Sequence, residues 1–440
     1  MSEHLAAAQS TAVPATSAEA AQRVAVACLI GTTIEWYDFF IYGTAAALIF
    51  NTQFFPQGSS TLAAMAAFGT FAVGFVARPV GAAVMGHYGD KIGRKAMLVL
   101  SLLTMGVATV LIGILPTYAQ IGVLAPVLLV LLRLLQGFGV GGEWGGAILM
   151  AVEHAPASRR GFYGGFPQMG VAAGLILANL AFLLVTLVLS DEAFASYGWR
   201  IPFIISAVLV VLGLYVRATV SESPVFAAMK SKGHEQRMPI IEVFRRSPRQ
   251  VLLGGMACLA QNGMGYVVLV FMLSYGTTRL GLPRSTMLAI IIAANVLELA
   301  ATLYFAKLSD RLGRRTVFLG GTGCGVIVGA LFFTVVDTGS AAAVLAAVVA
   351  ARLCIAAMYG PLAAMLCEMF DTDIRFSGIS ISYQLGSIVG GALAPFIASL
   401  LLAGTGTSLS VSAYMAALCL ISFFSVLAIR ETRAVSLSRS

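Results

Sequence analysis

Two carboxylates stand three residues apart in an otherwise apolar stretch, at Glu35 and Asp38, with Tyr42 four residues further on. On a helix this spacing puts the three side chains on one face. Two carboxylates close together in a low dielectric cannot both ionise readily, so the pair predicts a group that binds a proton in the physiological range. Asp38 and Glu35 are therefore both candidates for the residue that carries the proton. The alternative is that neighbouring arginines neutralise both carboxylates permanently.

Three arginines, Arg78, Arg133 and Arg352, also lie far inside apolar stretches. A guanidinium group offers planar, bidentate hydrogen bonds to a carboxylate, which makes Arg133 and Arg78 candidate anion-binding residues. Gln136 lies one helical turn from Arg133, on the same face. The competing interpretation is an ion pair that locks two helices together, and it applies with more force to Arg352. An acid that releases its arginine on protonation would make anion binding depend on a proton.

Further polar residues in the apolar stretches are candidates for hydrogen bonds to a hydroxylated substrate, although each alone is more often a contact between helices. They are Gln261, Asn262, Tyr266, Glu298, Tyr383 and Gln384. Glu143 follows the run "GVGG", where gating or structural pairing is the first interpretation and direct proton coupling the second. Each ion at the centre of a membrane helix costs roughly 2.5–3.5 kcal/mol. A chain that retains several such ionisable residues in its apolar stretches therefore retains them for a function.

The surroundings of these groups are a membrane. Of the 440 residues, 59% are hydrophobic and only 10% are charged, with a mean hydropathy of +0.92. Soluble domains contain about 25% charged residues, so this composition predicts an all-α integral membrane protein in contact with the lipid bilayer. Twelve apolar stretches suffice to cross a bilayer: 24–50, 62–86, 96–115, 121–152, 160–188, 199–216, 251–275, 284–306, 316–336, 341–367, 376–402 and 410–429.

The basic residues are distributed unevenly along this pattern. If both termini are cytoplasmic, 21 of the 27 Lys and Arg residues lie on that side, which is the bias expected of cytoplasmic loops. The same bias accounts for the net charge of +8, so no nucleic-acid partner is needed. The predicted organisation is a disordered cytoplasmic tail at 1–23, a six-helix bundle at 24–216, a cytoplasmic loop at 217–250, a second bundle at 251–430 and a tail at 431–440.

A cassette of charged and glycine residues occurs twice, as "GHYGDKIGRK" at 86–95 and "AKLSDRLGRR" at 306–315. Its aspartates, Asp90 and Asp310, are separated by half the length of the chain. Both cassettes fall in the predicted loop between the second and third span of a half. Two related halves that each contain buried charge describe a transporter whose halves rock around a central site.

The first cassette resembles the G-x-x-x-D-[RK]-x-G-R-[RK] signature of the major facilitator superfamily, and the second is similar to its degenerate copy. Other segments resemble the metabolite:proton symporter branch, with shikimate-type transporters as the nearest group: "IEWYDFFIYG", "FVARPVGAAVMGHYGD", "RLLQGFGVGG", "GGEWGGA", "GWRIPFIISAVLVVLGLYVR" and "SISYQLGSIVGGALAPFIA". The match covers essentially 24–433. It implies twelve helices in two pseudo-symmetric six-helix bundles, and an acid that recurs in the helix-1 motif favours Asp38 as the coupling residue.

The resemblance also implies a conformational latch at the cytoplasmic face. An aspartate would cap the start of a helix in the other half, where free N–H groups and the helix dipole favour a carboxylate, and an arginine would pair with an acid at the end of the fourth helix. The residues are Asp90, Arg94 and Glu153 in the first half and Asp310, Arg314 and Glu368 in the second. The alternative is that these charges only enforce topology.

The sequence as a whole predicts a monomeric secondary active transporter of a bacterial-type cytoplasmic membrane, which imports a small organic acid with protons. The substrate would be a hydroxylated or aromatic monocarboxylate such as shikimate, or a di- or ketocarboxylate. No ATP-binding motif is present, so the proton gradient is the expected driving force and no cofactor is expected. The six cysteines lie in apolar runs and the four histidines in tails or loops, which predicts neither a metal site nor an enzyme.

Two other transport functions stay open. The first is proton symport of zwitterionic osmolytes such as proline or betaine, although no heptad pattern follows the last span, which disfavours osmosensing. The second is export of a metabolite by the same fold.

Overall fold

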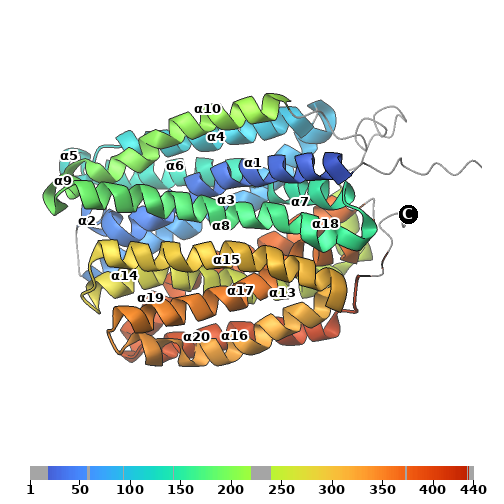
Figure 1. Ribbon diagram of the computed structural model, residues 1–440. Helices are drawn as coiled ribbons and strands as arrows, with labels where there is room; N and C mark the ends of the chain where they lie inside the picture. Colours follow the sequence, from blue (N-terminus) through green and yellow to red (C-terminus); the bar gives the residue numbers. More distant parts are fainter. Residues whose placement is uncertain are drawn as a thin grey trace, which may run out of the picture.

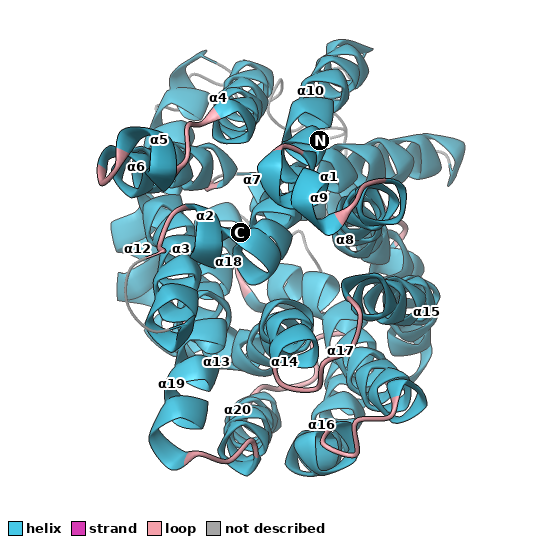
Figure 2. Cartoon of the chain, turned by 90° about the vertical axis from the view of Figure 1, so that its left-hand side faces the viewer, coloured by secondary structure: helices cyan, strands magenta, loops and turns pink. Residues whose placement is uncertain are grey.

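The computed structural model describes residues 18–56, 60–92, 94–141, 143–219, 239–371, 374–433 and 435, and within these ranges every regular element is a helix. The helices run nearly parallel to one another in Figure 1, where the first half of the chain (blue to green) lies above the second half (yellow to red). Figure 2 shows the same helices seen along their axes. The two halves are therefore two bundles that lie side by side in the plane of a membrane.

The first bundle contains six long helical segments, some of them divided. They are α1 (Ala18–Ala45) with η1 (Ala46–Phe50) and α2 (Asn51–Gln53), α3 (Ser60–Ile92), α4 (Arg94–Ile114), α6 (Leu124–Val140) with α7 (Glu143–Glu153), α8 (Arg160–Val188), and α10 (Ile201–Thr219). Short helices connect them: α5 (Tyr118–Ile121), η2 (Ala157–Arg159), α9 (Asp191–Ser196) and η3 (Gly198–Arg200).

The second bundle repeats this arrangement. It consists of α13 (Pro248–Tyr266) with η4 (Val267–Phe271) and α14 (Met272–Thr278), α15 (Arg284–Leu312), α16 (Arg314–Val336), α17 (Ala341–Met369), α18 (Arg375–Gly386) with η5 (Ser387–Ala392) and α19 (Ala394–Thr405), and α20 (Leu409–Ala428). The helix α12 (Pro239–Arg246) precedes it. The π-helical turns η1 and η4 occupy matching places in the first helix of each bundle.

In the described part of the chain, eleven helices are long and apolar enough to cross a bilayer, and the shorter apolar helix Val99–Ile114 supplies one more. The predicted all-α fold with twelve membrane helices is confirmed. Helix 7, Pro248–Thr278, has 94% of its apolar window buried inside the protein, and it contacts α17, α18 and α20. This helix is therefore central to the second bundle.

The helix ends differ from those expected from hydropathy. The first helix begins at Ala18 rather than at 24, because the segment "AEAAQR" consists mostly of good helix formers and Glu19 pairs with Arg23 one turn later at 2.6 Å. The two cassettes also differ from expectation. Helix α3 continues to Ile92 and α15 to Leu312, so most of each cassette is helical where a loop was expected. The length of an apolar stretch predicts which residues lie in the bilayer. It does not predict where the helix ends, because the helix continues until a residue interrupts its backbone.

In the second half that interruption is a single glycine. Gly313 alone separates α15 from α16, with φ +104° and ψ 151°, a region that is essentially restricted to glycine. The turn brings the N-terminus of α16 against the carboxylate of Glu431, which accepts hydrogen bonds from the backbone N–H groups of Arg314 (2.9 Å) and Arg315 (3.1 Å). The conformation of Gly313 therefore positions the charged end of the second bundle.

Two helices of the first bundle approach each other closely through glycines. A Cβ atom on Gly137 of α6 would collide with the carbonyl oxygen of Gly74 of α3, and a Cβ atom on Gly74 would meet the guanidinium group of Arg133. The missing side chains allow α3 and α6 to pack backbone to backbone, and they leave room for a large cation between helices that are otherwise apolar.

Replacing Gly313 by alanine should destabilise the protein by about 1–3 kcal/mol, because alanine rarely adopts this backbone conformation. The measurement is the midpoint of thermal unfolding in detergent. Gly320→Ala is the matched control, since no atom lies within 4 Å of the added Cβ position there. Equal midpoints for the two variants would contradict the role assigned to the turn.

Candidate functional site

The two arginines of the first bundle are buried and surround one aromatic ring. Arg78 of α3 and Arg133 of α6 have 1% and 0% of their surface exposed. Their guanidinium carbons lie 4.2 and 4.3 Å from the ring centroid of Phe39 of α1. Arg78 also lies 4.2 Å from Phe75, and Arg133 lies 4.1 Å from Tyr42. Contact with aromatic faces stabilises a buried cation, particularly where water is excluded.

These cations keep unused hydrogen-bond donors. The Nε and Nη2 atoms of both Arg78 and Arg133 have no hydrogen-bond partner in the structure. No carboxylate within the described part of the chain pairs with either arginine. Burying an unpaired cation is costly unless something else supplies the opposite charge. The structural alternative for Arg133, an ion pair that locks two helices, is therefore not what the described residues form.

Asp38 directly precedes Phe39, whose ring both arginines contact, and it too is incompletely paired. Its side chain is fully buried, Oδ1 accepts a hydrogen bond from Ser206 of α10, and Oδ2 has no partner. Glu35 lies one turn earlier on α1 and is buried, with 5% of its surface exposed. A carboxyl group in such a place is most easily accommodated when it carries a proton.

Gln136 links the arginine to the backbone of Asp38. Its Oε1 accepts a hydrogen bond from Arg133, while Nε2 donates to the carbonyl oxygen of Asp38 at 3.0 Å and to Thr109 at 2.8 Å. Both bonding capacities of the amide are thus used. A displacement of the Arg133 side chain would be transmitted to the segment of α1 that carries Asp38 and Phe39.

In the second bundle, the buried arginine has an acid partner. Arg352 of α17 donates to Glu298 of α15 at 3.1 Å, and both side chains are almost completely buried. This pair joins two helices, as the structural interpretation of Arg352 expected. The Nε and Nη2 atoms of Arg352 remain without a partner.

Tyr266 of the second bundle packs against the aromatic side chains of the first bundle. Its ring centroid lies 5.5 Å from Phe71 and 5.4 Å from Phe75, and its hydroxyl lies within interaction range of Arg78, Arg133 and Arg352. Tyr266 is therefore the residue of the second bundle that interacts with the arginines of both halves. Tyr42, whose ring lies under Arg133, donates to Thr70 at 2.7 Å.

The remaining polar residues of the second bundle divide into two groups. Gln261 and Asn262 are buried on α13 close to Tyr266 in sequence; Nε2 of Gln261 has no partner, whereas Asn262 donates to the carbonyl of Cys258 in its own helix. Gln384 instead contacts the carbonyl oxygen of Gly141 in the first bundle at 3.3 Å. Tyr383, next to it, stacks on Trp144 with ring centroids 3.6 Å apart.

The Trp144–Tyr383 stack lies between α7 and α18 and so holds the two bundles together on one side of the aromatic cluster. Trp144 donates to Gln168, and Gln168 donates in turn to the carbonyl of Tyr359 of α17, each at 3.2 Å. Glu143, one residue before Trp144, has a side chain outside the described residues.

At the end of the bundles that carries the second cassette, Asp310 joins the two halves. Its carboxylate accepts hydrogen bonds from the backbone N–H groups of Gly161 (2.9 Å) and Phe162 (2.8 Å) at the start of α8, and from the side chain of Arg314 at 2.7 Å. A carboxylate at a helix N-terminus satisfies free N–H groups and interacts favourably with the helix dipole. The second cassette thereby caps a helix of the other half.

Arg314 extends this contact into a network. It pairs with Glu368 at the end of α17 at 3.2 Å, and Glu368 accepts a hydrogen bond from Thr432 at 2.8 Å. In the first half, Glu153 lies 3.5 Å from Arg375 at the start of α18. The side chains of Asp90 and Arg94 lie outside the described residues, so their predicted contacts with helix 11 and Glu153 stay predictions.

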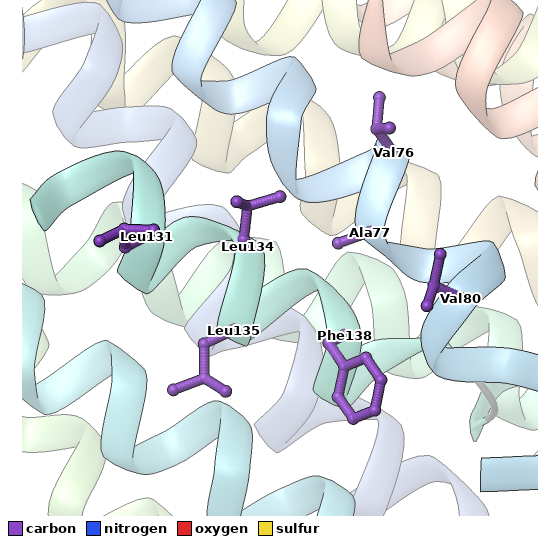
Figure 3. A pocket seen from close by; sticks show the side chains of 7 residues that line it. All are labelled: Val76, Ala77, Val80, Leu131, Leu134, Leu135 and Phe138. Atoms are coloured by element: carbon purple, nitrogen blue, oxygen red, sulfur yellow. The ribbon is translucent and has the colours of Figure 1, made fainter. Parts of the chain in front are cut away.

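A groove on the outer surface is not part of this centre. It lies between α3 and α6 and is lined by Val76, Ala77, Val80, Leu131, Leu134, Leu135 and Phe138 (Figure 3). Most of these side chains are exposed, and none is polar, as expected for a surface in contact with lipid. Among the described residues, no group of three His, Cys, Asp or Glu side chains is placed to hold a metal ion.

The functional residues that the sequence did not predict are mainly those that contact the predicted charged residues. Ser206 gave no signal, because a serine in an apolar helix is usual. Phe71, Phe75 and Arg78 could have been connected, since their spacing on α3 places them on one face. In an apolar stretch, however, such phenylalanines are indistinguishable from residues that face lipid or another helix.

Comparison with known proteins agrees with this architecture. A family model described as Major Facilitator Superfamily matches residues 28–380. The inner membrane metabolite transport protein YhjE of Escherichia coli is 43% identical over 94% of this chain and 95% of its own, and the shikimate transporter of Escherichia coli is 41% identical with the same coverage. The solved structure of the proton:xylose symporter XylE bound to 6-bromo-6-deoxy-D-glucose aligns with a TM-score of 0.76 at 19% identity, over 95% of this chain and 98% of that one.

Replacing Asp310 by asparagine should destabilise the protein by about 1–3 kcal/mol, because the cap loses its charge and the buried Arg314 loses one of its acids. Thermal unfolding in detergent measures the effect. Asp371→Asn changes an exposed carboxylate three residues after Glu368 and serves as the control. An unchanged midpoint in Asp310→Asn would show that the contact between α15 and α8 does not depend on this charge.

Proposed function

The chain belongs to the major facilitator superfamily, and from this premise we propose that it imports a small organic acid together with protons. It is a multi-pass membrane transporter of a small-molecule metabolite, not an enzyme. We place it in a bacterial-type cytoplasmic membrane as a monomer with both termini in the cytoplasm, as the distribution of basic residues favours. The proton gradient is the proposed driving force.

The observation that carries this proposal is the pair of buried arginines, Arg78 and Arg133, which keep four unpaired guanidinium nitrogens. A carboxylate is the ligand that matches such donors in both charge and geometry. The rings around the arginines keep the site apolar, which suits the apolar body of a cyclic or aromatic acid better than a second charged group. The arginines and the rings together favour a carboxylate attached to a compact apolar or hydroxylated body.

Asp38 is the proposed proton site. Its unpaired Oδ2 can hold a proton, and Ser206 orients the other oxygen. With Asp38 protonated, the two arginine charges are available to the substrate anion, so proton and anion enter together. When the proton leaves, the negative charge on α1 competes for the same arginines and weakens the hold on the substrate. Gln136 transmits the change, since it contacts both Arg133 and the backbone of Asp38.

Zwitterionic osmolytes fit this centre less well. The carboxylate of proline or betaine would meet the same arginines, but its ammonium group needs an acid or an open aromatic face. Asp38 carries the proton when the substrate binds, Glu298 is bound to Arg352, and the faces of Phe39 and Tyr42 are already covered by arginines. A hydroxylated monocarboxylate such as shikimate is therefore the first substrate to test. Gln261, Asn262 and Tyr266 are the proposed hydrogen-bonding residues for its hydroxyl groups.

Asp38→Asn should abolish accumulation of substrate against a gradient while exchange of internal for external substrate continues, because asparagine cannot release a proton. Uptake and counterflow into proteoliposomes with an imposed pH gradient separate the two activities. Asp371→Asn should accumulate substrate as the unchanged protein does. Gradient-driven accumulation by Asp38→Asn would remove this residue from the coupling mechanism.

Arg133→Lys should weaken carboxylate binding about 10- to 100-fold, because lysine keeps the charge but loses the planar donors, a loss of roughly 1.5–3 kcal/mol. The dissociation constant is measured by calorimetry with the organic acid that gives the largest thermal shift in a panel that includes shikimate. Arg430→Lys, at an exposed position, is the control. An unchanged affinity in Arg133→Lys would reduce Arg133 to a structural residue.

A further inference from the structure

The two halves of the chain can be aligned residue by residue at the central site. Asp90 and Asp310 are separated by half the length of the chain, and the π-helical turns that begin at Ala46 and Val267 have almost the same separation. With this offset, Arg133 of α6 corresponds to Arg352 of α17 to within a single position. The offset between the aspartates also makes Arg78 of α3 the direct counterpart of Glu298 of α15.

Equivalent positions in the two bundles therefore differ in charge. In the second bundle, the acid and the arginine form an ion pair between the second and fourth helix, Glu298 with Arg352 at 3.1 Å. In the first bundle, the same two places hold Arg78 and Arg133, which have no acid partner among the described residues. The first bundle needs a carboxylate from outside, whereas the second bundle supplies its own.

This difference limits where the centre can bind a carboxylate. Tyr266 of the second bundle packs on Phe71 and Phe75, beside the two unpaired arginines, so a substrate held by Arg78 and Arg133 faces the bundle that carries Arg352. Arg352 still has free donors at Nε and Nη2, but its charge is already balanced by Glu298. A second substrate carboxylate would meet a neutral pair, one member of which repels it.

We propose that Glu298 is a specificity-determining residue that restricts the carrier to acids with one carboxylate. The inference rests on the proposed function and narrows its substrate class, since both mono- and dicarboxylates were open from the sequence. One carboxylate binds between Arg78 and Arg133, in the place that corresponds to the Glu298 side chain in the other half. The rest of the substrate faces the second bundle with hydroxyl or apolar groups.

The test compares 2-oxopentanoate with 2-oxoglutarate, which differ only in a terminal methyl or carboxylate group. Competition calorimetry on the full-length protein in detergent gives the dissociation constants. The unchanged protein should bind 2-oxopentanoate at least tenfold more tightly than 2-oxoglutarate. Glu298→Gln should reduce or reverse this ratio by at least tenfold, because it frees the charge of Arg352 for the second carboxylate.

The double variant Glu298→Gln/Arg352→Gln is the matched control, because it removes the pair without creating a free cation. It should bind 2-oxoglutarate no better than the unchanged protein does. An unchanged ratio in Glu298→Gln, or equal binding of both acids by the unchanged protein, would overturn the proposal. If neither these two acids nor shikimate binds the unchanged protein, the failure lies in the proposed organic-acid function itself.

A second variant keeps the proposal testable if Glu298→Gln does not fold. Arg78→Glu copies the arrangement of the second bundle into the first, so the new carboxylate should pair with Arg133. This variant should fold, with a thermal midpoint at or above that of Arg78→Gln, and should bind neither acid. Binding of 2-oxopentanoate by Arg78→Glu with the affinity of the unchanged protein would show that the equivalence between the halves has no role in recognition.

Discussion

Two guanidinium groups buried without a carboxylate partner set the conditions for the rest of the structure. Neither Arg78 nor Arg133 could be inserted cheaply into a dry apolar bundle, since a central cation costs roughly 2.5–3.5 kcal/mol even on the more lenient scales. The bundle accommodates them with aromatic faces at about van der Waals distance, with Gln136, and with the space left by Gly74. These devices reduce the cost of the two charges but do not balance them, and a site whose charge is unbalanced is selective for an anion.

The contacts between the bundles include the centre itself and the end that carries the second cassette. Tyr266 packs into the aromatic cluster from the second bundle, Trp144 and Tyr383 stack between α7 and α18, and Asp310 caps α8. Each contact joins a rigid helix of one half to a helix of the other, so each must break or slide if the halves rock. The stack depends on dispersion and the cap on charge.

Much of this arrangement could be predicted from the sequence, because charges in an apolar chain are few and therefore informative. The positions of Asp38, Arg78 and Arg133 identified the centre, and the repeated cassette identified the two halves. The partners could not be predicted: Ser206 resembles any serine in a membrane helix, and Phe39, Phe71 and Phe75 resemble ordinary lipid-facing or core residues. The helical cassettes differed from expectation for a related reason. Hydropathy indicates where the chain leaves the lipid, whereas the end of helix α15 is set by the backbone conformation of Gly313.

The two halves of this duplicated fold pair their buried arginines differently. The second bundle has its own ion pair, whereas the first bundle leaves its arginines available to a charged substrate. If both halves had the Glu298–Arg352 arrangement, the centre would be neutral and an anion would gain little from entering it. If both had two arginines, the closed empty carrier would hold four uncompensated cations. One neutral half and one cationic half leave an unbalanced positive charge, which attracts an anion to the first bundle. Such asymmetry between equivalent positions is the property that lets binding of one anion favour closure of the bundles, because closure removes water from charges that are then paired.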